Sequence, residues 1–367
     1  MTNRERLIAM AAGRPIDRPP YFCFFGPWGE TLARWHAEGL PADKRWDDGL
    51  GFDAGITIVP VKLGYLPAFE YEELADEGET LVFRDAQGIT QRVRKGKSTI
   101  PQYLDYPIKS RADWEQLKKR LDPDDPARFP DDWPNIAATL NLGDAAVQIG
   151  HYPYGLFGTL RDMIGVEDLL TGFYDFPDLI EDMINYLTDF WIAIWSKAVR
   201  HVKLDAIHMW EDMSGRSGPL ISPAMVRKYM APCYRRMRDF CDANGVSLFT
   251  LDTDGDVSRL IEPFMDAGVN LLFPFEVQAG SDINQVVKQH PSLICLGGID
   301  KRALAISREA IDAELARIRP ALASGRYIPQ LDHLIHPEIP YENFVYFCMR
   351  LREIIEADFH VVLPREA

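Results

Sequence analysis

Eight short apolar runs are spaced along the chain, and each ends in small or polar residues. They cover residues 21–25, 54–59, 145–149, 206–210, 247–251, 270–273, 293–296 and 326–329. Short apolar runs bounded by turn-forming residues are typical of buried strands. We therefore expect eight strands.

Helical periodicity fills most of the gaps from the third run onward. Apolar residues recur at helical spacing in segments such as 178–199, 223–243, 257–267 and 309–322. Ser222-Pro223 is typical of a helix start, and Asn244-Gly245 of a helix end. Strands that alternate with helices pair in parallel, and eight of them favour closure into a (β/α)₈ barrel. We expect residues 1–367 to form a single α/β TIM-barrel domain.

Three segments lie outside this alternation. Thr2 and Glu5 match a capping box, which predicts an N-terminal helix over residues 6–12. Residues 81–84 and 89–93 flank Ala86-Gln87-Gly88, which predicts a β-hairpin inserted after the second strand. Segment 121–135 holds four prolines and five aspartates. Because proline removes a backbone donor, we expect this segment to be an irregular surface excursion within the domain.

Composition and charge narrow the possible partners. The 367 residues are 47% hydrophobic and 26% charged, which is typical of a folded globular protein. Forty Lys and Arg against 55 Asp and Glu give a net charge of -15, so nucleic acid and anionic membranes are disfavoured as partners. Five scattered cysteines without a C-x-x-C pair predict no disulfide framework. No apolar leader or membrane span is apparent, and we expect a cytoplasmic protein acting on a small molecule.

Candidate chemistry lies just after the predicted strands, because the active site of an α/β barrel forms at the carboxyl ends of its strands. The positions found there are Gly26, Trp28, Gly150, His151, His208, Glu211, Asp212, Asp252, Asp254, Glu276, Asp300, Asp332 and His333. Seven acids and three histidines would thus meet at one rim. Such a cluster raises carboxyl pKa values unless a cation neutralises it, and indicates a divalent metal or acid/base catalysis.

Structural roles compete with these functional ones. Asp252 and Asp254 flank a turn and are equally typical of helix capping. Glu211 and Asp212 precede a flexible loop whose Arg216 offers either of them a salt bridge. His208 shares the strand face of Ala206 and Trp210, where it would be a hydrogen-bonded interior residue.

Several stretches resemble one family. The N-terminus, residues 2–10 with Arg14-Pro15-Ile16-Asp17-Arg18-Pro19-Pro20, resembles that of uroporphyrinogen-decarboxylase-like proteins. Agreement continues at Glu211-Asp212, Gly218-Pro219-Leu220-Ile221-Ser222-Pro223, Asp254-Gly255-Asp256, Gly297-Gly298-Ile299-Asp300-Lys301, Asp332-His333 and Pro340-Tyr341-Glu342-Asn343. The superfamily includes the decarboxylase and methyltransferases that move methyl groups between small molecules and a corrinoid. The resemblance implies one barrel with a deep cleft at the strand ends.

Departures from the decarboxylase pattern favour the methyltransferase branch. True decarboxylases carry an Arg-Gln-Ala-Gly-Arg segment after the first strand, where this chain has Phe25-Gly26-Pro27-Trp28-Gly29. Their pyrrole-binding aspartate is replaced at Ile58-Val59-Pro60, and a tyrosine and a serine of their site fall near Arg161 and Asp212. The histidine position is kept as His333. A substrate with eight carboxylates would lack its partners here.

The resemblance also implies a metal and a corrinoid. The related methyltransferases hold zinc with His-x-Cys and a late cysteine; these positions become Asp252, Asp254 and His333 here. Zinc or another divalent metal on these residues would polarise the oxygen of a methyl ether, and Glu211 would be a fourth ligand or the general acid. The cobalamin would be carried by a separate protein.

Three functions remain as hypotheses. The first is a methyltransferase that demethylates a small O-methyl, possibly aromatic, substrate. We expect catalysis by Glu211, Asp212 and His333, and substrate binding by Trp28, His151, His208, Trp210 and Arg216. The second is a decarboxylase or lyase acting on a small acid, and the third a non-catalytic binding barrel. The family also suggests a homodimer.

Overall fold

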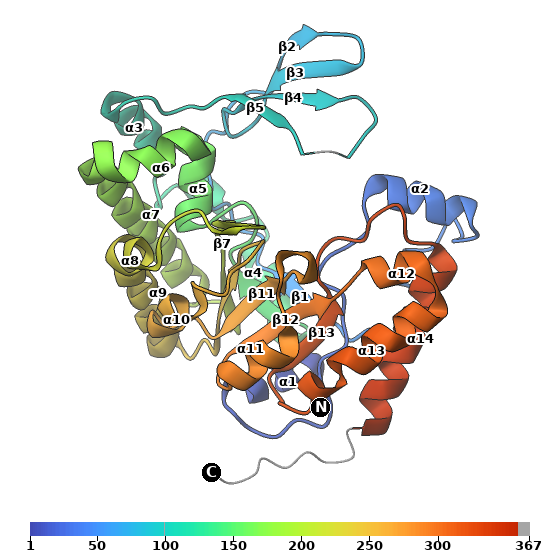
Figure 1. Ribbon diagram of the computed structural model, residues 1–367. Helices are drawn as coiled ribbons and strands as arrows, with labels where there is room; N and C mark the ends of the chain where they lie inside the picture. The colour runs from blue at the N-terminus through green and yellow to red at the C-terminus, as the bar shows by residue number, and fades with distance from the viewer. Residues whose placement is uncertain (99, 359–367) are drawn as a thin grey trace.

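A curled sheet of seven parallel strands organises the molecule in the computed structural model, which describes residues 1–98 and 100–358 (Figure 1). Its order is β1-β6-β7-β10-β11-β12-β13, with every neighbouring pair parallel. The strands are β1 Ile56–Ile58, β6 Ala146–Ile149, β7 Ala206–Trp210, β10 Leu248–Asp252, β11 Leu271–Phe275, β12 Ile294–Ile299 and β13 Tyr327–Leu331. Seven of the eight predicted runs therefore form this sheet.

The first predicted strand, residues 21–25, is wrong. This segment lies between β13 and the start of β1, but it forms no ladder: its backbone bonds side chains and, at one point, the backbone N–H of Asp53. Phe24 N donates to Gln330 Oε1 at 2.7 Å, and Tyr21 N donates to Asp53 Oδ2 at 2.8 Å. Prolines at positions 19, 20 and 27 also limit backbone donors around it. Among the described residues, an irregular segment therefore lies where an eighth strand was expected, and the parallel sheet has seven strands.

Helices cover the outer face of the sheet (Figure 1). The α-helices that follow α1 (Asn3–Ala11) in the described part of the chain are α2 Gly29–Ala37, α3 Arg111–Leu117, α4 Trp133–Leu142, α5 Leu156–Ile164, α6 Val166–Asp175, α7 Pro177–Ala198, α8 Pro223–Met225, α9 Ala231–Asn244, α10 Ile261–Asp266, α11 Ile283–Gln289, α12 Arg302–Ile306, α13 Arg308–Leu322 and α14 Tyr341–Asp358. The predicted helix over 223–243 is interrupted by a π turn, Val226–Met230, just before Pro232. Proline cannot donate to the carbonyl four residues earlier, which explains the break. Helix α10 is shorter than the predicted 257–267.

Helix α1, Asn3–Ala11, closes the amino end of the barrel. Thr2 and Glu5 form the predicted capping box at its start. Its Leu7 and Met10 pack with apolar residues at the beginnings of the strands, such as Ala206 and Leu248. Arg4 anchors the helix through Asp205 at 2.8 Å. With this end filled, the strand carboxyl ends are the open end of the barrel.

The insertion after β1 is larger than the predicted hairpin. The strands β3 Thr80–Arg84 and β4 Thr90–Arg94 form a hairpin, and β2 Glu72–Asp76 and β5 Gln102–Asp105 extend it to four antiparallel strands. This sheet projects from the body of the molecule (Figure 1).

Segment 121–135 is irregular only in part. It contains a 3₁₀ turn, Pro126–Arg128, and the start of α4. Arg128 is fully buried and donates to four backbone carbonyls, those of Lys62, Gly64, Arg120 and Asp122. The expectation of a simple surface excursion is thus wrong for Arg128, because its guanidinium satisfies buried carbonyls that would otherwise lack donors.

Two sequence expectations concern chemistry outside the site. All five cysteines are free thiols, as the absence of a disulfide pattern predicted. None of the helices in the described part of the chain has the length and apolarity needed to cross a membrane.

Candidate functional site

A cavity of about 750 Å³ lies at the carboxyl ends of the strands. Its walls come from the segments after β6, β7, β10 and β13, from helix α5, and from the inserted sheet. The lining residues are Phe24, Phe25, Trp28, Ile100, Tyr103, Tyr106, Tyr152, Arg161, Asp162, Val166, Trp210, Asp212, Asp252, Asp254, His333 and Leu334. Aromatic rings make up much of this wall, and one arginine faces four aspartates. The cavity is therefore aromatic and acidic.

Trp210 ends strand β7 against helix α5. The approach is close: a Cβ on Gly155 would lie 1.7 Å from the carbonyl oxygen of Trp210, so only glycine fits there. The Trp210 ring meets Tyr152 edge-on at 4.7 Å and carries the Arg161 guanidinium 4.8 Å from its centroid. The predicted site residue Trp210 is thus brought together with Tyr152 and with an arginine from α5.

Asp212 holds that arginine. Arg161 Nη1 forms an ion pair with Asp212 Oδ2 and donates to the Asp212 carbonyl at 3.1 Å. Asp212 has φ of +41°, the left-handed region that non-glycine residues rarely adopt. Burial raises the pKa of Asp212, although the neighbouring Arg161 opposes the shift. A strained backbone at a cavity wall, fixed by an ion pair, is typical of functional sites.

Asp254 and His333 form a second pair across the cavity. His333 Nε2 lies 3.3 Å from Asp254 Oδ1, and its ring stacks on Phe25 at 5.0 Å. Burial is the largest single effect and lowers the pKa of His333, but the hydrogen bond to Asp254 and the charges of Asp254 and Glu276 together outweigh it, so the net shift is upward. The other ring nitrogen, Nδ1, makes no hydrogen bond to any residue in the described ranges. The pair is arranged to hold a proton on the imidazole.

Asp252 lies between the two pairs and is 8% exposed. Its backbone carbonyl accepts from Glu211 N at 2.8 Å, but its carboxyl group has no hydrogen-bond partner among residues 1–98 and 100–358. Burial and repulsion by Asp254, Asp212 and Glu276 raise its pKa well above the ordinary value. The competing interpretation of Asp252 as a helix-capping residue would need a backbone N–H that donates to its carboxyl group, and none of the described residues supplies one.

Glu211 does not line the cavity. It is fully buried behind the wall and accepts four hydrogen bonds: from Leu156 N at 2.9 Å, Phe157 N at 2.6 Å, Gly158 N at 3.3 Å and Tyr234 Oη at 2.6 Å. The first three are the free N–H groups at the start of α5, where a carboxylate also favours the helix dipole. Burial raises the pKa of Glu211 to about 7, against the effect of these donors. The Glu211 side chain therefore does not lie where a general acid or a metal ligand of this cavity would have to lie.

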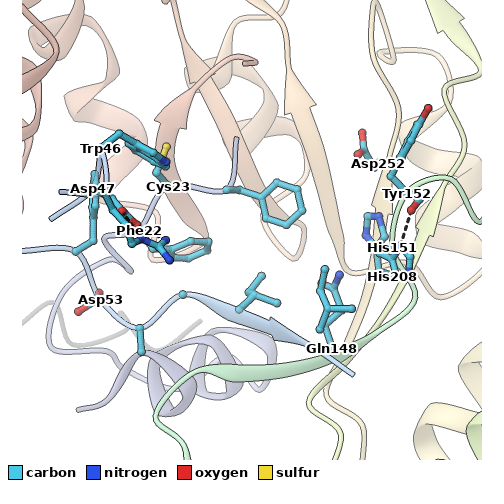
Figure 2. Close-up of a pocket in the computed structure, with 17 residues that line it drawn as sticks. Phe22, Cys23, Trp46, Asp47, Asp53, Gln148, His151, Tyr152, His208 and Asp252 are labelled. Atoms are coloured by element: carbon cyan, nitrogen blue, oxygen red, sulfur yellow. Dashed lines mark hydrogen bonds and ion pairs between the residues drawn. The ribbon is translucent and has the colours of Figure 1, made fainter. Parts of the chain in front are cut away.

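His208 and His151 line a second, smaller cavity of about 560 Å³. Figure 2 shows both histidines with Tyr152 and Asp252 on one side, and Phe22, Trp46 and Asp47 on the other. His208 is 2% exposed, its Nδ1 lies 2.9 Å from Thr250 Oγ1, and its ring stacks on Phe273 at 5.4 Å. Burial lowers its pKa to about 3. His208 is thus a neutral, hydrogen-bonded interior residue at the cavity wall.

The remaining predicted residues divide between rim, surface and core. Trp28 lines the larger cavity, whereas Arg216 is exposed between the short strands β8 Ser214–Gly215 and β9 Gly218–Pro219 and lines neither cavity. Three of the seven strand-end acids are engaged elsewhere. Asp332 is fully buried against Lys301 Nζ at 3.1 Å, Asp300 pairs with Arg302 at 2.6 Å, and Glu276 accepts from Gly255 N at 2.7 Å.

Sequence reasoning gave no functional role to several lining residues, among them two charged residues and two tyrosines. Arg161 and Asp162 lie on α5, and Tyr103 and Tyr106 come from the inserted sheet and the segment after it. An adjacent pair of charges in the otherwise apolar helix Leu156–Ile164 was a usable signal, because helices packed on a barrel rarely bury charges without a purpose. No signal indicated the tyrosines, since nothing in the sequence shows where an insertion folds back.

Asp162 gives the first testable prediction. Burial raises its pKa to about 7, whereas an unfolded aspartate ionises near pH 4. Between those values the folded protein binds a proton that the unfolded chain does not, so its stability falls as pH rises through this window. We expect Asp162→Asn, which cannot ionise, to lose less free energy of unfolding between pH 4 and pH 8, by on the order of 2 kcal/mol.

Urea unfolding at several pH values measures this difference. Glu167→Gln, at an exposed acid on the next helix, is the matched control and should follow the wild-type profile. Parallel profiles for the Asp162 variant and the wild type would contradict the buried, unpaired placement.

The predicted metal ligands do not fit a metal as they stand. Asp252, Asp254 and His333 line one cavity, but in the described part of the chain no three His, Cys, Asp or Glu side chains are arranged to hold a metal ion. The contact between His333 Nε2 and Asp254 Oδ1 occupies one of the atoms with which each residue could bind a metal. Zinc at these residues stays a prediction from the sequence.

Comparison with known proteins agrees with this architecture. The sequence profile of the uroporphyrinogen decarboxylase (URO-D) family matches residues 62–354. Among solved structures, a methyltransferase from Methanosarcina mazei superposes with a TM-score of 0.63 at 18% sequence identity, covering 96% of this chain and 98% of that one. No curated protein sequence matches the chain significantly. The profile spans most of the chain, including every strand of the parallel sheet except β1, and the chain belongs to the uroporphyrinogen decarboxylase family.

Proposed function

We propose that the protein is a methyltransferase that removes the methyl group from a small methylated substrate, an O-methyl and possibly aromatic compound. The observation that carries the proposal is the charge of the larger cavity. Its one arginine, Arg161, is already paired with Asp212, and three further aspartates face the same space. A substrate with several carboxylates would find no free cation there, which disfavours a porphyrinogen.

The shape and lining of the cavity agree with a small ring. About 750 Å³ is enough for a drug-sized molecule, and rings such as Phe25, Trp28 and Trp210 offer flat apolar contacts. The superposed structure from Methanosarcina mazei is also that of a methyltransferase, which supports the same class.

The paired Asp254 and His333 would supply the proton. When the methyl group leaves an ether, the carbon–oxygen bond breaks and the oxygen keeps the electron pair, so protonation of the oxygen lowers the barrier. Asp254 holds the imidazolium of His333 in place, and the unengaged Nδ1 is available to donate. Arg161 and Asp212 fix the Trp210 wall, and Glu211 fixes the start of α5 as a positioning residue.

The methyl acceptor would be a corrinoid carried by a separate protein. In its cobalt(I) form such a group supplies the nucleophile. Exposed apolar side chains at the cavity rim, with Ile100 86% and Tyr152 61% exposed, leave room for another molecule to approach. A homodimer is proposed from the family alone, and light scattering of the purified protein would test it.

A methyl-transfer assay tests the proposal. We expect methylcobalamin to form when the purified protein is mixed with cob(I)alamin and an aryl methyl ether from a panel that also contains methylated thiols. Its absorption spectrum reports the product directly. If no donor in the panel yields methylcobalamin, the proposal fails.

The alternative is a carboxy-lyase acting on a small acid. Membership of the decarboxylase family favours it, whereas the lack of an unpaired cation in the larger cavity does not. Release of CO₂ from a carboxylated aromatic by the purified protein, without methyl transfer from any ether, would decide for this alternative.

A further inference from the structure

The two cavities adjoin at three residues. Phe24, Tyr152 and Asp252 line both the larger cavity and the smaller one. The shared wall therefore joins the Asp254–His333 pair to the space beside His208 and His151. A ligand seated in the larger cavity reaches Asp252 without leaving the protein.

The charges around this junction do not balance. Arg161 is neutralised by Asp212, and His333 is engaged by Asp254. In the smaller cavity, Arg45 pairs with Asp47 at 2.9 Å. The carboxyl groups of Asp162 and Asp252 have neither a hydrogen-bond donor nor an ion-pair partner within residues 1–98 and 100–358. The cations named here are thus all paired, and none of them contacts these two carboxyl groups.

Of these two aspartates, Asp252 is the more deeply buried. It is 8% exposed and faces the cavities from the end of β10, yet nothing described donates to its carboxyl group. Buried polar groups in proteins are nearly always hydrogen-bonded, and an exception needs a ligand or another explanation. The adjacent His208 is neutral and bonded to Thr250, so it does not supply the counter-charge.

Aromatic rings surround the same place. Tyr152 and Trp210 meet at 77° with centroids 4.7 Å apart, so they present faces in two directions. Phe24, held edge-on against Phe273 at 4.6 Å, lines both cavities from the opposite segment. Aromatic faces attract cations electrostatically, and Arg161 already lies over the Trp210 ring in this way.

We propose that the substrate carries a positively charged nitrogen group, an ammonium, which binds to Asp252 between Phe24 and Tyr152. The methyl group then lies at the other end, in the larger cavity beside Asp254 and His333. The identification of the ligand as a methyl donor rests on the proposed function, whereas the charge preference rests on the cavity alone. The site accordingly rejects methoxyarenes that carry a carboxylate.

Calorimetric titration with three ligands of similar length tests the charge preference. The ligands are para-methoxyphenethylammonium, para-methoxyphenethyl alcohol and para-methoxyphenylpropionate. We expect the ammonium to bind about tenfold more tightly than the neutral alcohol, and the carboxylate not to bind. Equal affinities, or tightest binding of the carboxylate, would overturn the inference.

Two variants locate the effect. Asp252→Asn keeps the size of the side chain and should reduce the ammonium affinity to that of the alcohol, with the alcohol affinity unchanged. Asp256→Asn is the matched control, because Asp256 lies on the same loop but lines neither cavity, and it should bind all ligands as the wild type does. Circular dichroism verifies that both variants are folded. Retained ammonium preference in Asp252→Asn contradicts the inference.

The experiment separates this inference from the proposed function. Binding requires no methyl acceptor, so ammonium preference without methyl transfer from any ether leaves the inference standing and removes the function. Methyl transfer that is faster from the carboxylated ether does the reverse. A metal is tested in the same titration: if zinc binds stoichiometrically and abolishes ammonium binding, Asp252 serves a metal, and the inference fails.

Discussion

Replacement of His333 by alanine is expected to lower the turnover number for methyl transfer by about 100-fold to 10,000-fold, the usual contribution of a positioned general acid. The variant removes the side chain that pairs with Asp254 at 3.3 Å and stacks on Phe25. Without it, the proton that the Asp254–His333 pair would hold for the leaving oxygen is lost. Because the larger cavity keeps its aromatic walls, KM should change much less than the turnover number.

The leaving group supplies an internal check on this role. Methyl ethers of acidic phenols leave readily without a proton, so the loss in His333→Ala should shrink for them and stay large for ethers of ordinary phenols. His336→Ala is the matched control, since His336 packs on Trp28 at 4.6 Å and is not among the lining residues. A uniform loss for all leaving groups would contradict a proton-donating His333.

Glu211→Ala is expected to lower the free energy of unfolding by on the order of 4 kcal/mol. The wild-type carboxylate accepts from three backbone N–H groups of α5 and from Tyr234, all in a buried setting. Each donor left without a partner costs about 1–3 kcal/mol, and removal of the side chain also leaves a cavity. Denaturant unfolding followed by circular dichroism measures the loss.

Two further variants separate the structural role of Glu211 from a catalytic one. Glu276→Ala is the control for losing a strand-end acid, because Glu276 accepts one hydrogen bond from Gly255 N, and it should cost about 1 kcal/mol. Glu211→Gln keeps the volume and one acceptor oxygen, and we expect it to retain most of the turnover number. A fully folded Glu211→Gln with turnover reduced as far as in His333→Ala would instead restore Glu211 as the acid expected from the sequence.

Local signals in the sequence were sufficient for most of the sheet. Seven apolar runs became parallel strands because buried parallel strands must be apolar on both faces, and this leaves a continuous run in the sequence. The capping box at Thr2 and the helix end at Gly245, with φ of +68°, were equally local and equally readable. The run at 21–25 misled because an apolar extended segment has the composition of a strand whether or not its neighbours offer backbone partners.

The sequence predicted the positions of several cavity-lining residues but not the role of each side chain. Strand-end counting located Trp210, Asp212, Asp252, Asp254 and His333, which all line one cavity. It also collected Asp300 and Asp332, which pair with Arg302 and Lys301 instead. A carboxylate at a strand end can turn toward the cavity, a helix start or a buried lysine, and the choice depends on donors contributed by other parts of the chain.

The sequence by itself therefore determined the fold class, the family resemblance and the end of the barrel that holds the site, because periodicity, capping and motifs are properties of neighbouring residues. Tertiary structure alone decided that Glu211 supports α5, that Arg161 is paired with Asp212, and that no donor among the described residues contacts the carboxyl group of Asp252. All three results depend on which polar and charged groups contact one another after folding. Such a balance is set by residues that are distant in sequence and close in space.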